Sequence, residues 1–298
     1  MTDHAPLFSV IVPTYNRAAQ LGLCLRALAA QQYPRDRFEV IVADDGSRQP
    51  PRDIVASTDK NLDITLLTGS HGGPSATRNA GAARARGEFL AFTDDDCEPA
   101  ADWLSRLAAR IAGVPGHLVG GRTMNALTGN IYSEASQTLV DILYAYFNPH
   151  PDAAQFFASN NIAMRASEFH AIGGFLSSFR AAEDRELCDR WLHRGGRMIH
   201  APEVLVYHRH DLNALTLWRQ HFNYGRGAFL FHKMRARQGW GRLRPDPSFY
   251  LELFRYPLAH VGGTRGFLVE ALMTEMQLAN AAGFFFQAIK GSGSTARP

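Results

Sequence analysis

Short apolar runs alternate with helical patterns in the first part of the chain. Four runs rich in Val, Ile, Leu and Phe, each bounded by Pro, Gly, Asp or Ser, predict strands at residues 8–13, 38–47, 62–68 and 88–94. Between the first two, Leu21, Leu25 and Leu28 recur at helical spacing, and a second helical pattern covers residues 72–87. This alternation predicts a mostly parallel sheet covered by helices on both faces.

The alternation loosens after Trp103. The next segments predict a helix, a strand with polar insertions, a turn, a second helix, and one or two strands, at residues 136–147, 157–165, 172–175, 181–196 and 197–210. The remaining chain holds further helical patterns, and residues 291–298 predict a disordered end.

The composition is that of a globular protein with ample material for a core. Of 298 residues, 46% are hydrophobic and 20% are charged. The three cysteines lie far apart without a CxxC pair, which argues against a disulfide framework or a zinc site and fits a reducing cytosol. The first apolar run has no basic leader before it, so it predicts a strand and not a signal peptide.

Acidic residues follow two of the predicted strands. Asp44 and Asp45 follow the second strand, and residues 94–96 form an acidic triple after the fourth. Ligands of parallel sheets bind beyond the carboxyl ends of the strands, and adjacent carboxylates suit Mg²⁺ or Mn²⁺. Taken alone, the first pair fits an ordinary turn and the triple fits a surface loop. The chain has neither GxGxxG after the first strand nor GxxxxGK[ST], which argues against dinucleotide dehydrogenases and P-loop enzymes.

Five motifs, in this order, resemble those of family 2 glycosyltransferases: VIVPTYNR, VIVADDGS, GGPSATRNAGAARARGEFLAFTDDD, ASNNIAMR with IGGF, and EDRELCDRW. The resemblance implies the α/β GT-A fold, with a mostly parallel central sheet flanked by helices. It implies a catalytic domain over residues 1–212, with a nucleotide-sugar half at 1–100 and an acceptor half at 101–212. A basic, aromatic-rich helical extension at 213–290 and a disordered tail at 291–298 complete the expected organisation.

The resemblance implies a metal-dependent, hexosyltransferase-like enzyme. Its reaction would be inverting transfer from a nucleotide-diphosphate sugar, with UDP-sugars favoured, to a hydroxyl of a glycan or lipid-linked acceptor. This chemistry serves the synthesis of cell-surface polysaccharide or glycolipid and implies no nucleic-acid partner. Processive members of the family carry QxxRW after the fifth motif, whereas residues 215–227 do not, so we expect single additions.

The resemblance also implies a divalent cation, Mn²⁺ or Mg²⁺. Asp96 would bind the metal and the diphosphate, with Asp94 as the second arm, while Asp95 supports the loop or reaches a sugar hydroxyl. A histidine near the end of the strand EVLVYH often joins the metal or the diphosphate in this family. His208 is the first candidate and His210 competes with it.

The other roles carried over by the resemblance concern the nucleotide and the acceptor. Tyr15 would pack on the base and Asp45 would accept a hydrogen bond from it. Asn79 would lie near the diphosphate or sugar, or else on the helix surface. The remaining donor residues are Pro13, Thr14, Arg17 and Arg78.

On the acceptor side, the resemblance places Asn160 and Asn161, which could equally satisfy loop backbone. Asp184 would be the general base and Glu183 would orient the acceptor or the loop, although a helix start also favours acidic residues. Two rivals to an enzyme of this class are a non-catalytic sugar-nucleotide or glycan-binding module and a nucleotidyltransferase. Asp45, Asp96 and Asp184 occur together, which disfavours a module without a base.

Charge is uneven along the chain, and residues 205–298 carry 12 Lys or Arg against 5 Asp or Glu. Residues 226–244 are basic and aromatic, and residues 276–289 are an uncharged stretch of 14, short of the roughly 20 needed to span a bilayer. We expect a cytoplasmic protein that binds peripherally to the anionic inner face of the cell membrane. The alternatives are that these helices pack on the catalytic domain or form a homodimer contact with residues 284–286 buried, or that the arginines merely solvate surface helices.

Overall fold

The computed structural model describes residues 8–58, 62–241 and 246–292. It divides into two compact units. The first comprises Met1–Ala126, Asn148–Ser178 and Asp184–Arg209, and the second comprises Leu127–Phe147, Phe179–Glu183 and His210–Pro298. The boundaries expected at residues 212 and 290 stay predictions, and residues 293–298 of the expected tail lie outside the described residues.

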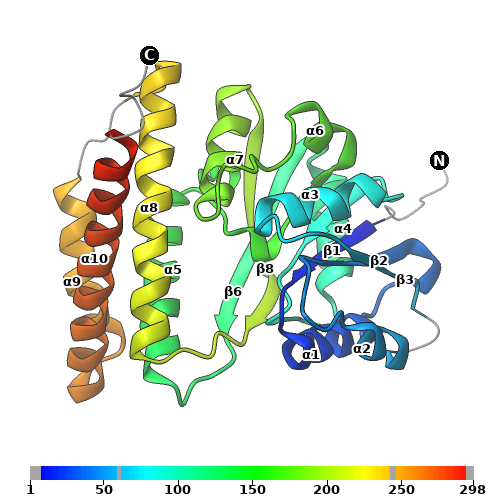
Figure 1. Cartoon of the computed structure of the whole chain (residues 1–298), viewed down its shortest axis with the longest axis horizontal. Helices are drawn as coiled ribbons and strands as arrows, with labels where there is room; N and C mark the ends of the chain where they lie inside the picture. The colour runs from blue at the N-terminus through cyan, green and yellow to red at the C-terminus, as the bar shows by residue number, and fades with distance from the viewer. Residues whose placement is uncertain (1–7, 59–61, 242–245, 293–298) are drawn as a thin grey trace. The chain divides into compact units, whose positions relative to one another are not determined.

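A single eight-stranded sheet forms the centre of the first unit (Figure 1). In chain order the strands are β1 (Phe8–Thr14), β2 (Phe38–Asp44), β3 (Ile64–Thr68), β4 (Phe89–Phe92), β5 (Cys97–Pro99), β6 (His117–Asn125), β7 (Ile162–Arg165) and β8 (Arg197–His208). Their order in the sheet is β3-β2-β1-β4-β7-β6-β8-β5. The strands β3, β2, β1 and β4 are parallel, and so are β6 and β8, whereas β7 and β5 run antiparallel to their neighbours.

Helices cover both faces of this sheet. The helices of the first unit are α1 (Ala18–Ala29), α2 (Arg52–Ser57), α3 (Pro74–Arg84), α4 (Trp103–Gly113), α6 (Ala166–Ala171) and most of α7 (Glu183–His193). Alternate residues of β1 pack with the buried side of α1 and α4 in one core cluster, because successive strand side chains point to opposite faces. On the other face α3 approaches β1 so closely that a Cβ at Gly81 would lie 2.6 Å from Ile11.

The four strands predicted in the first part of the chain are confirmed, as are the helices between them. The segment predicted as a strand at residues 157–165 is one only from Ile162, because Ser159–Asn161 form a 3₁₀ turn whose side chains are buried. Residues 197–208 form one strand with a register shift after Gly121 of its partner β6.

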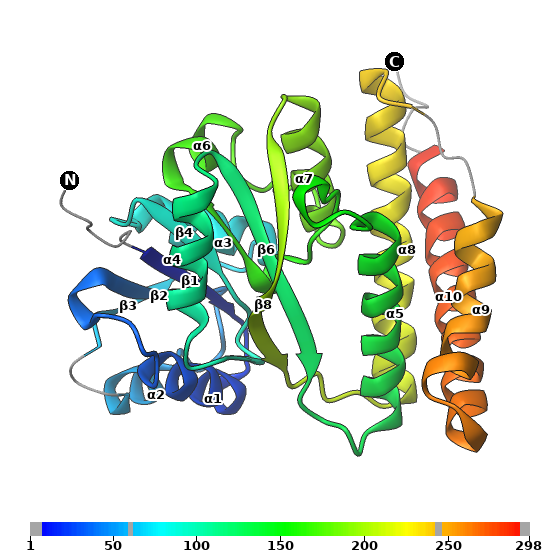
Figure 2. The same cartoon turned by 180° about the vertical axis from the view of Figure 1, so that it is seen from behind.

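The second unit is a helical bundle. It contains α5 (Ile131–Phe147), α8 (Ala214–Gln238), α9 (Pro247–His260) and α10 (Gly263–Ser292), which lie side by side in Figures 1 and 2. Glycines let α8 and α10 meet backbone to backbone, since a Cβ at Gly225 would lie 1.9 Å from the Asn280 carbonyl oxygen and one at Gly283 would lie 1.8 Å from that of Phe222. Among the residues that the structure describes, none of the helices combines the length and the apolarity needed to cross a membrane.

Candidate active site

The acidic triple begins one residue after the end of β4 and leads into β5, at the carboxyl end of the parallel strands. Asp95, the middle member, is buried and links this loop to the end of β1. Thr14 Oγ1 donates to its Oδ2 at 2.7 Å, and Arg17 Nη1 donates to its Oδ1 at 3.2 Å. Burial raises the pKa of Asp95 to about 6. The neighbouring Arg17 acts in the opposite direction and lowers this pKa, whereas the negative charge of Asp96 raises it further. These contacts fit the loop-supporting role expected for Asp95.

Asp96, the last member, meets cationic or donor groups on both carboxylate oxygens. Arg17 Nη1 donates to its Oδ2 at 2.8 Å, and His208 Nε2 lies 3.2 Å from its Oδ1. Strand pairing creates this second contact, because β5 and β8 align Cys97 with His208. Burial would lower the pKa of His208, but the Asp96 carboxylate outweighs it and holds that pKa above its ordinary value. Asp96 and Asp95 likewise raise the pKa of Arg17 against the effect of burial.

The two histidine candidates lie in different surroundings. His208 ends β8 in the first unit beside Asp96. His210 belongs to the second unit, where its carbonyl accepts a hydrogen bond from Ser133 Oγ and its ring lies 3.4 Å from Ser136 Oγ. The contact with Asp96 therefore favours His208 as the metal-side histidine.

The donor set around Asp96 fits a divalent cation. The ligand atoms of Asp96, Cys97 and His208 all lie within 4.8 Å of one another. Burial raises the pKa of the Cys97 thiol well above its ordinary value, so the thiol stays protonated and is a poor ligand for Mn²⁺ or Mg²⁺. A carboxylate and an imidazole remain, and this pair suits Mn²⁺. Asp94, the other expected arm, accepts a hydrogen bond from the buried Arg78 at 2.6 Å.

The expected base-binding residues lie at the loops after β1 and β2. Tyr15 is 43% exposed, and its ring lies 4.5 Å from that of His71, centroid to centroid. His71 Nδ1 in turn lies 2.9 Å from Asp45 Oδ2. Asp45 also accepts the backbone N–H groups of Gly72 at 2.7 Å and Gly73 at 3.0 Å. Asp45 thus organises the loop before α3, and its contact with the base stays a prediction. His71 is a site residue that the sequence did not single out.

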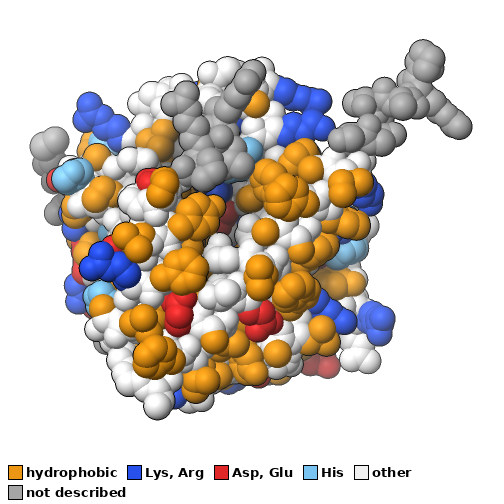
Figure 3. Space-filling model, turned by 90° about the vertical axis from the view of Figure 1, so that its left-hand side faces the viewer, with side chains coloured by type: hydrophobic (Ala, Val, Ile, Leu, Met, Phe, Trp, Pro, Cys, Tyr) orange, Lys and Arg blue, Asp and Glu red, His pale blue; other side chains and the backbone are white. Residues whose placement is uncertain are grey.

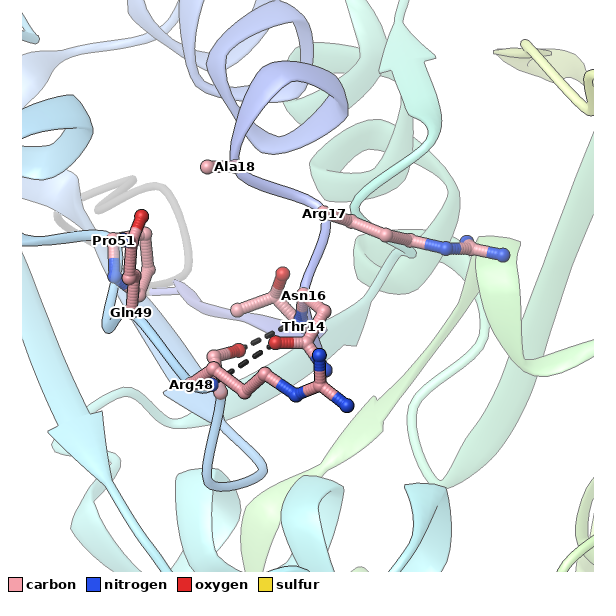
Figure 4. Close-up of a pocket in the computed structure, with 8 residues that line it drawn as sticks. Thr14, Asn16, Arg17, Ala18, Arg48, Gln49 and Pro51 are labelled. Atoms are coloured by element: carbon pink, nitrogen blue, oxygen red, sulfur yellow. Dashed lines mark hydrogen bonds between the residues drawn. The ribbon is translucent and has the colours of Figure 1, made fainter.

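A pocket of about 300 Å³ opens between these two loops (Figure 4). Asn16 bridges them from a left-handed conformation with φ of 54°. Its N–H donates to Ser47 Oγ at 2.7 Å, and its Oδ1 accepts the Arg48 N–H at 3.0 Å. The pocket is lined by Thr14, Asn16, Arg17, Ala18, Ser47, Arg48, Gln49 and Pro51.

Asn79 binds the backbone of a loop that is distant in sequence, at Phe175. Its Nδ2 donates to the Phe175 carbonyl at 2.7 Å and its Oδ1 accepts the Phe175 N–H at 2.9 Å, across 96 positions of sequence. Arg190, paired with the buried Glu186, donates to the Gly174 carbonyl at 2.5 Å. The turn at residues 172–175 is therefore fixed from α3 and from α7.

The two expected acceptor-side asparagines differ in their contacts. Asn160 Oδ1 accepts from Thr123 Oγ1 at 3.3 Å. Asn161 is fully buried, accepts the Trp103 Nε1–H at 2.9 Å, and donates to the carbonyls of Arg122 at 3.0 Å and Val204 at 2.9 Å. These partners fit the alternative role of satisfying loop backbone, and the acceptor-side role stays a prediction.

Replacing Asn161 with alanine is expected to destabilise the fold by roughly 2–5 kcal/mol, because it leaves a buried indole N–H, the buried Val204 carbonyl and the partly buried Arg122 carbonyl without their hydrogen-bond partner. Urea unfolding followed by circular dichroism measures this change. Asn160→Ala is the matched control and is expected to cost about 1 kcal/mol, since it removes a single long hydrogen bond. Equal stability of the two variants would contradict the structural role of Asn161.

Glu183 and Asp184 begin α7, as their acidic character at a helix start allows. Ala182 before them has a φ of 64°, a left-handed conformation that is uncommon for alanine. Asp184 Oδ1 accepts the N–H of Arg185 at 2.7 Å. This contact stabilises the helix start and leaves the base role of Asp184 as a prediction.

Solved structures of low sequence identity share this fold. The chain matches the mannosyltransferase PcManGT from Pyrobaculum calidifontis, in complex with GDP-Man and Mn²⁺, with a TM-score of 0.62 and 20% identity over 99% of this chain and 77% of that one. It matches S. aureus TarS 1-349 in complex with UDP-GlcNAc with a TM-score of 0.56 and 17% identity over 96% and 92%. The expected GT-A fold is confirmed.

Sequence relatives are glycosyltransferases by name. Glycosyltransferase AglE of Haloferax volcanii is 40% identical over 124 residues, which are 41% of this chain and 40% of that protein. Pre-mycofactocin glycosyltransferase of Mycobacterium tuberculosis is 31% identical over 210 residues, which are 68% and 42%. The chain thus spans less than half the length of these curated relatives. The model of the family "Glycosyl transferase family 2" matches residues 9–182, and the chain belongs to that family.

Proposed function

We propose that this chain is an inverting, metal-dependent glycosyltransferase that adds single sugars from a nucleotide-diphosphate sugar to an acceptor hydroxyl, in the synthesis of cell-surface polysaccharide or glycolipid. The observation that carries the proposal is the contact of Asp96 with His208, next to two arginines on the acidic triple. A structural neighbour that holds GDP-Man and Mn²⁺ supports the choice of donor class and cation.

The site residues have four separate roles in the proposed reaction: holding the cation, supplying positive charge, binding the base and accepting a proton. Asp96 and His208 would hold the cation, which supplies positive charge to the leaving diphosphate. Arg17 and Arg78 add positive charge at the same strand ends. Tyr15 and Asp45 bind the base. Asp184 takes the proton from the acceptor hydroxyl as that oxygen attacks the anomeric carbon, and with no carboxylate nucleophile assigned, one displacement inverts the configuration.

A panel of UDP- and GDP-sugars with Mn²⁺ tests this function. We expect release of nucleoside diphosphate from one donor, with UDP-sugars favoured, and its loss on chelation. Proton NMR of a product made with a simple glycan acceptor is expected to show an inverted anomeric centre. Tight donor binding without any turnover would favour the non-catalytic module instead, and a retained configuration would overturn the mechanism.

We further propose that the acceptor is lipid-linked and that the second unit binds an anionic membrane at its cytoplasmic face. Large apolar side chains are exposed along α9 and α10 (Figure 3): Tyr250, Leu251, Phe254, Leu258, Phe267, Leu268, Leu278, Phe285, Phe286 and Ile289. Basic residues of the same unit, such as Arg255 and Lys290, supply charge for anionic lipid. Part of the expected basic stretch, residues 242–245, lies outside the described residues.

Within the second unit, Phe285 is 65% exposed and Phe286 is 48% exposed, so these rings belong to its apolar surface. Phe284 is half-buried and contacts Phe229 within the bundle. We compare two occupants for the apolar surface of α9 and α10, namely a membrane and a second copy of the chain. The excess of positive charge in residues 205–298 favours the membrane.

Co-sedimentation with liposomes distinguishes these occupants. We expect the protein to pellet with vesicles containing about one-third anionic lipid, to be released by salt, and to stay in solution with neutral vesicles. The double variant Phe285→Ser and Phe286→Ser is expected to lose most of this binding. A matched control, Tyr15→Ser, removes an exposed aromatic ring of the first unit and is expected to pellet like the parent. Supernatant protein under all conditions, with a dimer in gel filtration, would assign the surface to a homodimer.

A further inference from the structure

Arg17 is the cation that contacts the two buried carboxylates of the acidic triple. Its Nη1 lies 3.2 Å from Asp95 Oδ1 and 2.8 Å from Asp96 Oδ2. The other oxygen of Asp96 lies beside His208. Arg17 and His208 therefore contact different oxygens of the same carboxylate, and a metal ion bound by Asp96 and His208 would lie close to the guanidinium.

The two arginines at this cluster are held differently. The Arg78 side chain is 5% exposed and extends from α3, so it is part of the packed structure. The Arg17 side chain is 49% exposed and projects from the loop between β1 and α1. Figure 4 shows it extending away from the bridge between Asn16 and Arg48. Arg17 can thus change partners without opening the core, whereas Arg78 cannot.

Electrostatics requires some cation at this place. Three consecutive carboxylates repel one another, and burying Asp95 and Asp96 without positive charge would be costly. A divalent ion on Asp96 would supply that charge and would also repel the guanidinium. Both cations would draw on the negative charge of the same Asp96 carboxylate, so each weakens the binding of the other.

We propose, on the basis of the proposed function, that Arg17 is an exchangeable counter-cation: it occupies the Asp95–Asp96 carboxylates while the donor is absent and transfers to the donor's phosphates when metal and donor bind. Arg17 then weakens the binding of metal alone. A diphosphate gives the displaced guanidinium a new anionic partner, so nucleotide strengthens metal binding and metal strengthens nucleotide binding by the same factor. Arg17 is in this sense the residue that makes the two bind together.

Mn²⁺ affinity, measured by the electron paramagnetic resonance signal of free Mn²⁺ with and without UDP or GDP, tests this role without any turnover. The parent is expected to bind Mn²⁺ weakly alone and at least about fivefold more tightly with the nucleotide. Arg17→Gln is expected to bind Mn²⁺ more tightly alone and to lose most of the enhancement by nucleotide. Arg17→Lys keeps a cation and is expected to stay close to the parent.

Arg48→Gln is the matched control, because Arg48 lines the same pocket and has the same charge but no contact with the acidic triple. It is expected to leave the affinity for Mn²⁺ alone unchanged.

Three outcomes decide the proposal. If Arg17→Gln is folded by circular dichroism but binds Mn²⁺ no more tightly than the parent, the proposed exchange of Arg17 is wrong and Arg17 merely supports the loop. If Arg17→Gln does not fold, parent-like behaviour of Arg17→Lys sustains the proposal and tighter binding of Mn²⁺ alone overturns it. If the parent binds no Mn²⁺ even with either nucleotide, the proposed metal-dependent function itself fails.

Discussion

Asp96→Ala is expected to lower sugar transfer by roughly 10²–10³ or more, the usual cost of removing a preorganised electrostatic contact to a leaving group. The variant loses the carboxylate that contacts both His208 and Arg17. It is also expected to lose the dependence of residual activity on Mn²⁺ concentration. Steady-state rates over a Mn²⁺ titration in metal-buffered solution measure both changes.

Asp95→Asn is the control for this prediction, because it changes the neighbouring carboxylate by one atom and keeps an oxygen for Thr14 Oγ1. It is expected to lose much less transfer than Asp96→Ala and to keep the Mn²⁺ dependence. Activity of Asp96→Ala equal to the parent in buffered metal would remove Asp96 from the site. A larger loss in Asp95→Asn than in Asp96→Ala would move the centre of the site to Asp95.

The sequence predicted well those strands that carry an apolar run and are buried along almost their whole length. β1, β2 and β4 are buried on both faces, so their runs are continuous and stand out against the polar loops around them. β5 could not be found in this way, since it has only three residues, Cys97–Pro99, and one of them is a glutamate. Yet β5 follows the acidic triple directly, and its pairing with β8 brings Asp96 beside His208.

The acidic residues of the candidate site were predictable one by one, and the family resemblance named His208 as the first metal-side candidate, but the contacts that join these residues could not be derived from local patterns. His208 lies beside Asp96 because of a strand register between segments 111 positions apart, and no local pattern encodes a register. His71 carries no periodic signal either, because a half-exposed loop histidine looks like any surface residue. Asp45 could be recognised from the sequence as a turn residue. Its hydrogen bonds with the N–H groups of Gly72 and Gly73 could not be predicted, because they depend on how the loop before α3 folds back.

Asp184→Asn is expected to lower the transfer rate by roughly 10²–10⁴, the usual contribution of a general base, with donor affinity preserved. The amide cannot accept the proton of the acceptor hydroxyl. Its oxygen can still accept the Arg185 N–H that Asp184 Oδ1 accepts now, so the start of α7 is expected to remain intact. Rates measured over pH, together with calorimetric titration of UDP in the presence of Mn²⁺, separate the two effects.

Glu183→Gln is the matched control, because it makes the same chemical change one residue earlier in the same helix start. Its effect is expected to fall mainly on the KM for the acceptor, and its pH profile is expected to keep the acidic limb that the general base of the parent produces. Asp184→Asn is expected to lose that limb. If Asp184→Asn loses nucleotide binding along with activity, Asp184 belongs to the donor site. If it loses stability instead, the helix-start contact with Arg185 is its main role, because a carboxylate is favoured over an amide near the positive end of a helix.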